Sequence, residues 1–524
     1  MGDMEFLQNL LNGIQLKDEK FNDELRKSFY SMTAKEQDDT LENISRCIGD
    51  DWSDGIYLFS YLLYIIKDAK IIKYINNALM HNNIDALSLI NYIYQIGVLT
   101  FGNAIDVSNK LFLQTDGIYI SAVNDISSHI NKEKLAYIPF AERKKGTVLI
   151  AARSILAEVH APTMIVCNIY NYLQKLGYNV IVLIGYMGGV QKDKKNDVYY
   201  HAVDNSLVET TQKLQTDHFG LCINVCNIAF TSQFFNKELE MAVDYVRGVN
   251  PEFIIDIGGM NIIADVCSRF TTVCSFPCVG TPVHSAAPVI VRCFHCEGEA
   301  EKIYDSYLTQ DKKVYELMIA NELTAVSKIS RQNVALRNKK EKDKFILLIV
   351  GNRLDREVTD EFLNMLNQIL EGEPDVYVEV IGECDKLKNK IKTSDKSDRY
   401  IFIGYADNLQ EAMADGDLFV NPPRTGGGTG ASLALKNHTP IVTLGNCDVA
   451  IRGEGFVCGE LAQYPEIIKK YIHDAGFMKQ QQEYCEHQDK LLNNVDSVGN
   501  MKKFCEELRN YIIAEEENNG TYSV

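Results

Sequence analysis

The chain has 524 residues, of which 46% are hydrophobic, and a formal net charge of −18. A chain of this length can bury several hydrophobic cores, so we expect two to four domains. The acidic balance disfavours an extended nucleic-acid interface, because phosphate backbones select basic surfaces, but it leaves room for nucleotides, which need only a few positive groups.

The first residues carry no secretory signal pattern, because Met1-Gly-Asp-Met-Glu-Phe6 is acidic and lacks an apolar segment. The longest apolar run, Ile56–Ile66, is far shorter than the ~20 residues that a membrane helix requires, and it predicts a buried helix. The 14 cysteines are scattered, as is typical of reduced intracellular thiols. We therefore expect a cytoplasmic protein without a transmembrane segment.

Residues 1–140 predict an all-helical accessory domain. Proline is absent before Pro139, glycine is sparse, and apolar residues recur at spacings of three and four, as in Leu25, Phe29 and Met32. Two roles are open for this domain, a packing or oligomerisation module and a module that recognises an acceptor.

Residues 141–335 change to an α/β pattern. Thr147–Ala152 predicts a strand, Ser154–Thr163 a loop, Met164–Leu176 a helix and Tyr178–Ile184 the next strand. This β-α-β opening is typical of a Rossmann-like domain.

Three side chains follow strands of this domain and could serve as a general base. His160 lies in the first loop, Asp256 lies in the buried run Phe253–Met260, and His284 follows a later strand. Other roles are open for two of them. His160 could instead bind a phosphate, or be solvent-exposed without a function as histidines in loops often are, and Asp256 could be a buried acid that caps a helix or braces a loop.

Five cysteines gather within thirty residues of this domain, and Cys293-Phe-His-Cys296 has the spacing of a zinc knuckle. The preceding Val289–Cys293 is strand-like rather than a tight turn, which favours buried free thiols over metal ligands.

Residues 336–495 predict a second doubly wound α/β domain. Apolar runs at Lys344–Val350, Val376–Ile381, Tyr400–Ile403 and Ile441–Leu444 alternate with helical stretches. Ligands of such domains bind at the carboxyl ends of the strands.

A glycine loop follows another short strand, Asp417–Val420, and precedes the helix-forming run Ala431–Leu435. Backbone amides and the positive end of a helix dipole would meet a diphosphate there. The charged stretch from Gln310 to Lys344 predicts the link between the two α/β domains.

The order of these motifs resembles the donor half of glycosyltransferases with the GT-B fold. The resemblance rests on Gly351-Asn-Arg353, Ile403-Gly-Tyr-Ala-Asp407, Asp415–Pro423, the glycine loop and Thr439-Pro-Ile-Val442. It implies an α/β fold of two Rossmann-like domains that face a cleft, here preceded by the all-helical domain. An appended helical domain is also found in bacterial enzymes that glycosylate cytoplasmic proteins, which is an analogy of architecture only.

The resemblance also implies the residues that bind the donor. Diphosphate would bind the glycine loop and Arg353, and the base would lie beside Ile403–Tyr405. The family's lysine partner to this arginine is missing here, and Arg356, Arg424 or Lys436 could replace it. The expected donor-binding residues are Gly351, Asn352, Arg353, Ile403, Gly404, Tyr405, Arg424, Gly426, Gly427, Gly428 and Thr429. The sequence departs from many retaining members, which have glutamates where Thr425 and Leu433 stand, and the stereochemical outcome therefore stays open.

The implied function is transfer of a hexosyl or N-acetylhexosaminyl group from a nucleotide sugar, with a uridine diphosphate (UDP) sugar as the expected donor, to a protein or glycan acceptor. No cofactor and no obligatory metal are implied. Two alternatives stay open, a non-catalytic transferase-like partner, because of the missing glutamates, and a nucleotide-sugar epimerase. Residues 496–524 predict an amphipathic helix, Met501–Ile513, that packs back on the first α/β domain, and a disordered tail from Glu515.

Overall fold

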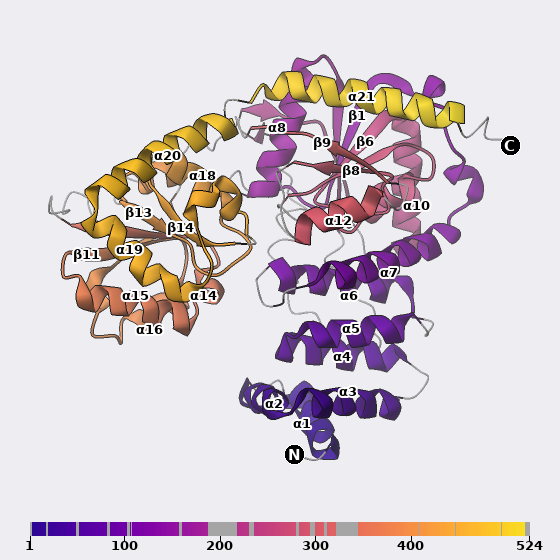
Figure 1. Cartoon of the computed structure of the whole chain (residues 1–524). Coiled ribbons are helices and arrows are strands. Elements are labelled where there is room, and N and C mark those ends of the chain that lie inside the picture. Colours follow the sequence, from indigo (N-terminus) through magenta and orange to yellow (C-terminus); the bar gives the residue numbers. More distant parts are fainter. Residues whose placement is uncertain are drawn as a thin grey trace.

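The computed structural model describes residues 3–16, 19–48, 52–80, 84–101, 105, 107–156, 160–186, 217–218, 220–229, 235–278, 282–293, 299–308, 312–320, 344–406, 408–445, 447–493 and 495–518. The chain begins with stacked helices, continues into one α/β domain and then a second α/β domain beside it, and its last helix returns to the first α/β domain (Figure 1). None of the described helices is long and apolar enough to cross a membrane.

The helical domain consists of α1 (Asp3–Leu16), α2 (Glu19–Ser31), α3 (Ala34–Ile48), α4 (Trp52–Ile66), α5 (Ala69–Leu79), α6 (Ala86–Phe101) and α7 (Asn109–Ser128). The apolar spacing that predicted these helices marks their buried faces, since Leu25, Phe29 and Leu62 are fully or almost fully buried. Asp68 and Ser108 cap α5 and α7 by accepting hydrogen bonds from backbone N–H groups in the first turn.

The first α/β domain has a parallel sheet in the order β5-β2-β1-β6-β7-β8-β9. Its strands are β1 (Lys144–Ala152), β2 (Asn179–Tyr186), β5 (Val225–Ala229), β6 (Pro251–Ile257), β7 (Val273–Phe276), β8 (Val289–Arg292) and β9 (Lys313–Glu316), and a separate hairpin joins β3 (Asp217–His218) and β4 (Leu221–Cys222). Its helices are α8 (Ala161–Lys175), α10 (Phe235–Val249), α11 (Ile262–Cys267) and α12 (Glu299–Leu308).

The helical domain and one face of this sheet share a continuous core. Leu149 of β1 and Ile254 of β6 belong to the same buried cluster as Phe59 and Tyr92 of the helical domain. The opposite face of the sheet is covered by α8 and by the last helix, α21 (Ser497–Asn518), through Phe504 and neighbouring apolar residues. The helical domain is therefore packed as part of the first α/β domain, on the side away from α21 (Figure 1).

The second α/β domain has a parallel sheet in the order β12-β11-β10-β13-β14-β15. Its strands are β10 (Phe345–Val350), β11 (Val376–Ile381), β12 (Tyr400–Gly404), β13 (Leu418–Val420), β14 (Ile441–Leu444) and β15 (Val457–Cys458). Its helices are α14 (Leu354–Glu357), α15 (Asp360–Gly372), α16 (Asp385–Ile391), α17 (Leu409–Ala412), α18 (Gly428–Lys436), α19 (Tyr464–His473) and α20 (Ala475–Asn493). Separate buried clusters cover the two faces of the sheet.

The expected fold class is confirmed, because two parallel Rossmann-like sheets follow an all-helical segment. Two local expectations were wrong. Helix α8 begins at Ala161 rather than Met164, because proline is compatible with the first turn of a helix. Residues 515–518 belong to α21 rather than to a tail. The boundary predicted near residue 335 lies outside the described residues, and the domain boundaries stay predictions.

Candidate functional site

The glycine loop lies at the carboxyl end of β13 and leads directly into α18. Gly427 occupies the position before the helix with φ +104, a left-handed conformation that favours glycine, and no side chain caps the helix there. Gly428 and the exposed Thr429 form the first turn, and Gly426 is buried just before it. Uncapped backbone N–H groups at a helix N-terminus form a natural anion site.

Arg424 holds this loop in place through three hydrogen bonds. Its guanidinium donates hydrogen bonds from Nε to Asn421 Oδ1 (2.7 Å), from Nη1 to Glu357 Oε2 (2.7 Å) and from Nη2 to the Val350 carbonyl (2.8 Å). A Cβ added at Gly427 would lie 2.7 Å from Nη2. Arg424 is buried and engages all three nitrogens, so its contacts favour a structural role over the expected contact with a donor.

Arg353 lies at the carboxyl end of β10, the strand next to β13, as the residue before α14. Its Nη2 is 3.0 Å from Glu357 Oε1, and its side chain is 39% exposed, in contrast to that of Arg424. Two arginines thus share the Glu357 carboxylate, and Asp448 is a further acidic residue beside the glycine loop. Burial lowers the pKa of Arg353, whereas the charge of Asp448 raises it. Gly351 and Asn352 form the turn that precedes Arg353.

Arg452 is a further cation at this site that sequence reasoning missed. It ends the short helical turn Ala450–Arg452 after β14, and its Nη2 would lie 3.2 Å from a Cβ placed on Gly428. Its Nε is buried without a hydrogen-bond partner among the described residues. Burial lowers the pKa of Arg452 below its ordinary value, whereas the charge of Asp448 raises it. The only signal in the sequence was a basic residue shortly after the strand that follows the glycine loop.

The expected base-binding segment lies at the end of β12, an edge strand of the same sheet. Ile403 and Gly404 end β12, and Tyr405 follows with 40% of its surface exposed. β11 and β10 separate β12 from β13, so with strands ~4.8 Å apart Tyr405 and the glycine loop are separated by roughly 14 Å along the carboxyl edge. A nucleoside diphosphate laid along this edge would extend from Tyr405 to the first turn of α18.

The only Asp-x-Asp pair of this domain within the described residues is Asp415-Gly-Asp417, and it lies at the amino ends of the strands. Asp417 Oδ2 accepts a hydrogen bond from the Ile346 N–H (2.7 Å), at the amino end of β10 and β13. Asp417 therefore joins two strands at the end of the sheet away from the glycine loop. Two surface hollows, one beside Tyr178 and one beside Asp417, also lie at the amino edges of the two sheets.

The carboxyl edges of the two sheets face each other. Cys278 lies just after β7 of the first domain. The pKa of its thiol is raised by burial and is also shifted by the charges of Arg153 and Asp256 from its own domain and of Asp448 from the second domain. The pKa of Arg452 in the second domain, which burial lowers, is in turn raised by Cys293, which follows β8 of the first domain. The ends of β7 and β8 in the first domain therefore lie near Asp448 and Arg452 of the second domain, at the position where the fold expected from the sequence has its interdomain cleft.

His160 lies on the first-domain side of this cleft as the residue before α8. Its Nδ1 is 3.0 Å from Thr163 Oγ1, which also accepts a hydrogen bond from the Leu156 N–H. Burial, followed by the charge of Arg153, lowers the pKa of His160 to about 4, so the ring is neutral at neutral pH. The ring is partly exposed.

Asp256 is fully buried in β6. Burial and the neighbouring Asp265 raise the pKa of Asp256 well above its ordinary range, whereas the charge of Arg153 opposes this shift. Asn261 and Ser275 are close enough to lower that pKa, but neither makes a hydrogen bond of good geometry with the carboxyl oxygens, which have no partner among the described residues.

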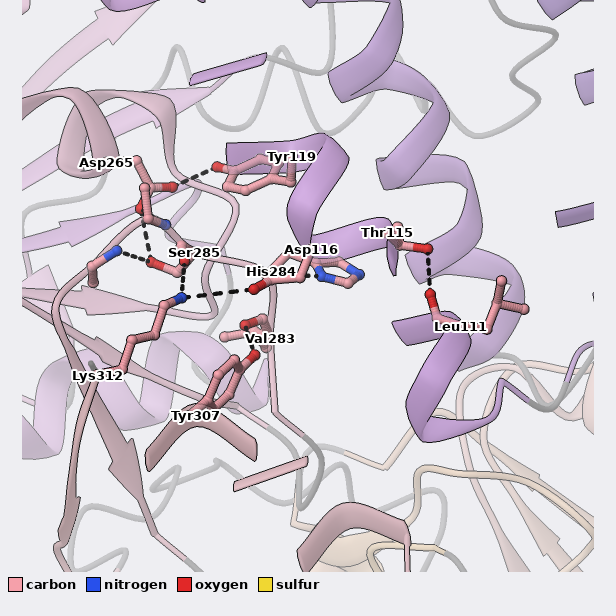
Figure 2. Close-up of polar contacts among 12 residues, drawn as sticks. Leu111, Thr115, Asp116, Tyr119, Asp265, Val283, His284, Ser285, Tyr307 and Lys312 are labelled. Atoms are coloured by element: carbon pink, nitrogen blue, oxygen red, sulfur yellow. Dashed lines mark hydrogen bonds and ion pairs between the residues drawn. The ribbon is translucent and has the colours of Figure 1, made fainter. Parts of the chain in front are cut away.

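His284 points away from the cleft and into the interface with the helical domain (Figure 2). Its Nδ1 is 3.3 Å from Asp116 Oδ1 of α7, and its ring stacks on Phe112 at a centroid distance of 4.2 Å. Asp116 also attracts Lys312, whose Nζ donates to the Ser285 carbonyl at 2.7 Å. The imidazole is 7% exposed, so of the three candidate bases His284 is held as part of a domain contact.

A second buried carboxylate extends this interface. Asp265 accepts hydrogen bonds from Tyr119 Oη of α7 (2.5 Å), from Ser285 Oγ (2.7 Å) and from the Ala286 N–H (2.7 Å). Burial raises the pKa of Asp265 to about 6, and these hydrogen bonds oppose the shift. Polar contacts from α7 thus fix the segment 283–286 that follows β7.

The cysteine cluster contains buried thiols where it is described. Cys267, Cys274 and Cys293 are buried thiols that form no disulfide among the described residues, whereas His295 and Cys296 lie outside the described residues. In the part of the chain that the structure describes, no three His, Cys, Asp or Glu side chains gather as metal ligands would.

No known family profile matches the sequence, and no curated protein matches it. Solved structures with a similar fold include a mutant of the Thermobaculum terrenum O-GlcNAc transferase, at 12% identity and a TM-score of 0.49, over 99% of this chain and 100% of that one. A Rickettsia africae glycosyltransferase aligns at 10% identity and a TM-score of 0.47, over 71% of this chain and 99% of that one. S. aureus TarM aligns at 8% identity and a TM-score of 0.47, over 70% of this chain and 99% of that one.

These similarities are distant and concern the fold alone. The two parallel sheets with their carboxyl edges facing a cleft, and a last helix that returns to the first α/β domain, are the GT-B architecture that the sequence motifs predicted.

Proposed function

We propose that this protein transfers a sugar from a nucleotide sugar, with a UDP-sugar as the donor, to an acceptor bound in the interdomain cleft. The observation that carries the proposal is the uncapped N-terminus of α18 beside the glycine loop, with Arg353 and Arg452 next to it. A diphosphate bound there would accept hydrogen bonds from the first-turn amides and meet two guanidinium groups.

Transfer breaks the bond between the sugar and the diphosphate and leaves negative charge on the diphosphate. The positive end of the α18 dipole and the two guanidiniums would stabilise this developing charge, which is the usual source of the largest rate effect. Arg424 and Glu357 contribute indirectly, by holding the loop and by orienting Arg353. The nucleobase would stack on Tyr405 at the edge of the sheet.

An acceptor hydroxyl must lose a proton as it attacks the sugar. Among the three candidate bases, His160 fits this role best, since Asp256 is fully buried and His284 is enclosed by the helical domain. If Nδ1–H donates to Thr163 Oγ1, the neutral ring leaves Nε2 free to accept the proton. We propose a protein or a glycan as acceptor and a hexosyl or N-acetylhexosaminyl group as the sugar. Leu433, which stands where many retaining members have a glutamate, packs on the core.

Calorimetry with UDP tests the donor site directly. Arg353→Gln and Arg452→Gln should each weaken UDP binding by about 10- to 150-fold, because a hydrogen bond to a charged group is worth roughly 1.5–3 kcal/mol. Arg356→Gln is the matched control, because Arg356 is exposed on α14.

UDP binding and turnover of UDP-sugars, measured on the same variants, separate the alternatives. A chain that binds no UDP would support the non-catalytic partner, whereas interconversion of UDP-sugars without any acceptor would support an epimerase. Slow release of free sugar and UDP from a UDP-sugar, lost in Arg452→Gln and retained in Arg356→Gln, is the expected result for a transferase. Equal UDP affinity in all three variants would contradict the placement of the diphosphate.

A further inference from the structure

The acceptor side of the cleft contains an arginine that no part of the proposed donor site uses. Arg153 directly follows β1, and its Nη2 would lie 4.0 Å from a Cβ placed on Gly258, the residue after β6. Its guanidinium lies over the ring of Tyr94 from α6 of the helical domain, with Cζ 5.0 Å from the ring centroid. Two elements of the first α/β domain and one helix of the helical domain thus converge on this group.

Arg153 has an unused donor at this position. Its Nη1 is buried and has no hydrogen-bond partner among the described residues. A buried N–H without a partner costs about 1–3 kcal/mol, and more when the group is charged, so such a group is generally retained where a ligand satisfies it.

The positive charge of Arg153 forms no ion pair within 4.0 Å among the described residues. Burial and the neighbouring Asp265 raise the pKa of Asp256 well above its ordinary range, although the charge of Arg153 lowers it. Burial lowers the pKa of His160 to about 4 and raises the pKa of the Cys278 thiol to about 12. A partly buried guanidinium without an ion-pair partner attracts an anion, since the attraction is screened less than in water.

We propose that Arg153 forms a second anion subsite in the cleft, which binds a carboxylate or phosphate group carried by the acceptor. The guanidinium fork offers paired N–H donors that match the geometry of either group. Tyr94 orients the fork by stacking on its face, which gives the helical domain a direct part in binding the acceptor.

The position of Arg153 favours the acceptor over the donor as the source of this anion. The diphosphate site lies on the opposite wall of the cleft, at α18, Arg353 and Arg452. Arg153 instead neighbours His160, whose pKa it lowers and which is the candidate for receiving the acceptor's proton. An anionic group a short distance from the reacting hydroxyl would therefore place that hydroxyl beside His160. This assignment to the acceptor rests on the proposed function, whereas the anion subsite itself does not.

The test uses inorganic phosphate as the probe, titrated by calorimetry into the full chain with and without saturating UDP. With the donor site filled by saturating UDP, wild type should bind one phosphate, and Arg153→Gln should weaken this binding about tenfold or more. Without UDP, the donor site at α18 should take up phosphate as well. Tyr94→Leu should weaken the binding measured with UDP less, because it removes only the stacking. Arg353→Gln should lower UDP affinity and leave the phosphate binding at saturating UDP unchanged.

Each outcome separates the possibilities. Phosphate binding that is unchanged in Arg153→Gln would overturn the subsite, and so would the absence of phosphate binding in wild type. If no phosphate binds at saturating UDP although phosphate binds without it, the anion site at Arg153 belongs to the donor, and this result would overturn the assignment of the site to the acceptor. Failure of UDP binding alone would refute the proposed function and leave the phosphate result intact. If Arg153→Gln does not fold, Arg153→Lys keeps the charge without the fork and should weaken phosphate binding about three- to tenfold.

Discussion

Arg424 gives the sharpest test of the local structure, because its sequence position suggested a donor contact and its contacts indicate a brace. The guanidinium joins the carboxyl ends of β10 and β13 and reaches the buried Glu357 carboxylate of α14. We expect Arg424→Met to destabilise the second α/β domain because it leaves three buried acceptors with fewer donors.

The magnitude follows from the three acceptors. Breaking a buried ion pair costs about 3–5 kcal/mol, and the lower value applies here because Glu357 keeps Arg353 as a partner 3.0 Å away. Loss of the guanidinium's hydrogen bonds to Asn421 Oδ1 and to the Val350 carbonyl adds about 1 kcal/mol each. The expected loss in the free energy of unfolding is therefore about 5 kcal/mol. With an m-value of about 2 kcal/mol/M, the urea midpoint of this domain falls by about 2.5 M.

Amide hydrogen exchange against urea, read by mass spectrometry, measures the loss domain by domain. Peptides from β10 and β13 should lose protection at lower urea in Arg424→Met, whereas peptides from β1 and β6 serve as an internal control. The double variant Arg424→Met with Glu357→Gln should recover part of the loss, since no buried carboxylate then lacks its partner. Unchanged exchange together with a tenfold weaker UDP affinity would refute the brace and return Arg424 to the donor site.

Two further predictions concern Tyr405 and His160. Tyr405→Ala should weaken UDP binding about fivefold or more, because base stacking on an aromatic ring is worth roughly 1–3 kcal/mol, while the affinity for inorganic pyrophosphate should stay the same; an equal loss for both ligands would place the base elsewhere. His160 has a pKa of about 4 in the folded chain and an ordinary value near 6.5 when unfolded, so the unfolded state binds more protons between these values and stability rises with pH across that window. His160→Gln should remove this component, so the difference in melting temperature between wild type and variant should change between about pH 4.5 and 7; a constant difference would show that the ring is not buried as described.

The sequence was sufficient for the elements of the donor half. The predicted strand Ile441–Leu444 coincides with β14, and Val376–Ile381 coincides with β11, because fully buried parallel strands require continuous apolar runs with polar or glycine boundaries. The glycine loop and its helix were also predicted, because consecutive glycines followed by helix-forming residues are a local pattern in the sequence. In the structure Gly427 adopts a φ of +104, a conformation that favours glycine. Helix periodicity likewise marked the helical domain and the returning helix α21.

The sequence by itself thus determined the fold class, the order of the helical and α/β segments and the location of the uncapped N-terminus of α18, all of which depend on local periodicity and backbone preference. Only the tertiary structure decided which charged groups are available. Arg424 and Arg353 have the same chemistry, yet one is enclosed by Asn421, Glu357 and Val350 and the other is partly exposed. His284 is enclosed by α7, which lies over a hundred residues earlier in the chain, and Arg153 and Arg452 lack local motifs. Burial and pairing come from contacts distant in sequence, so a residue's charge, exposure and partners are properties of the folded chain rather than of its neighbours in sequence.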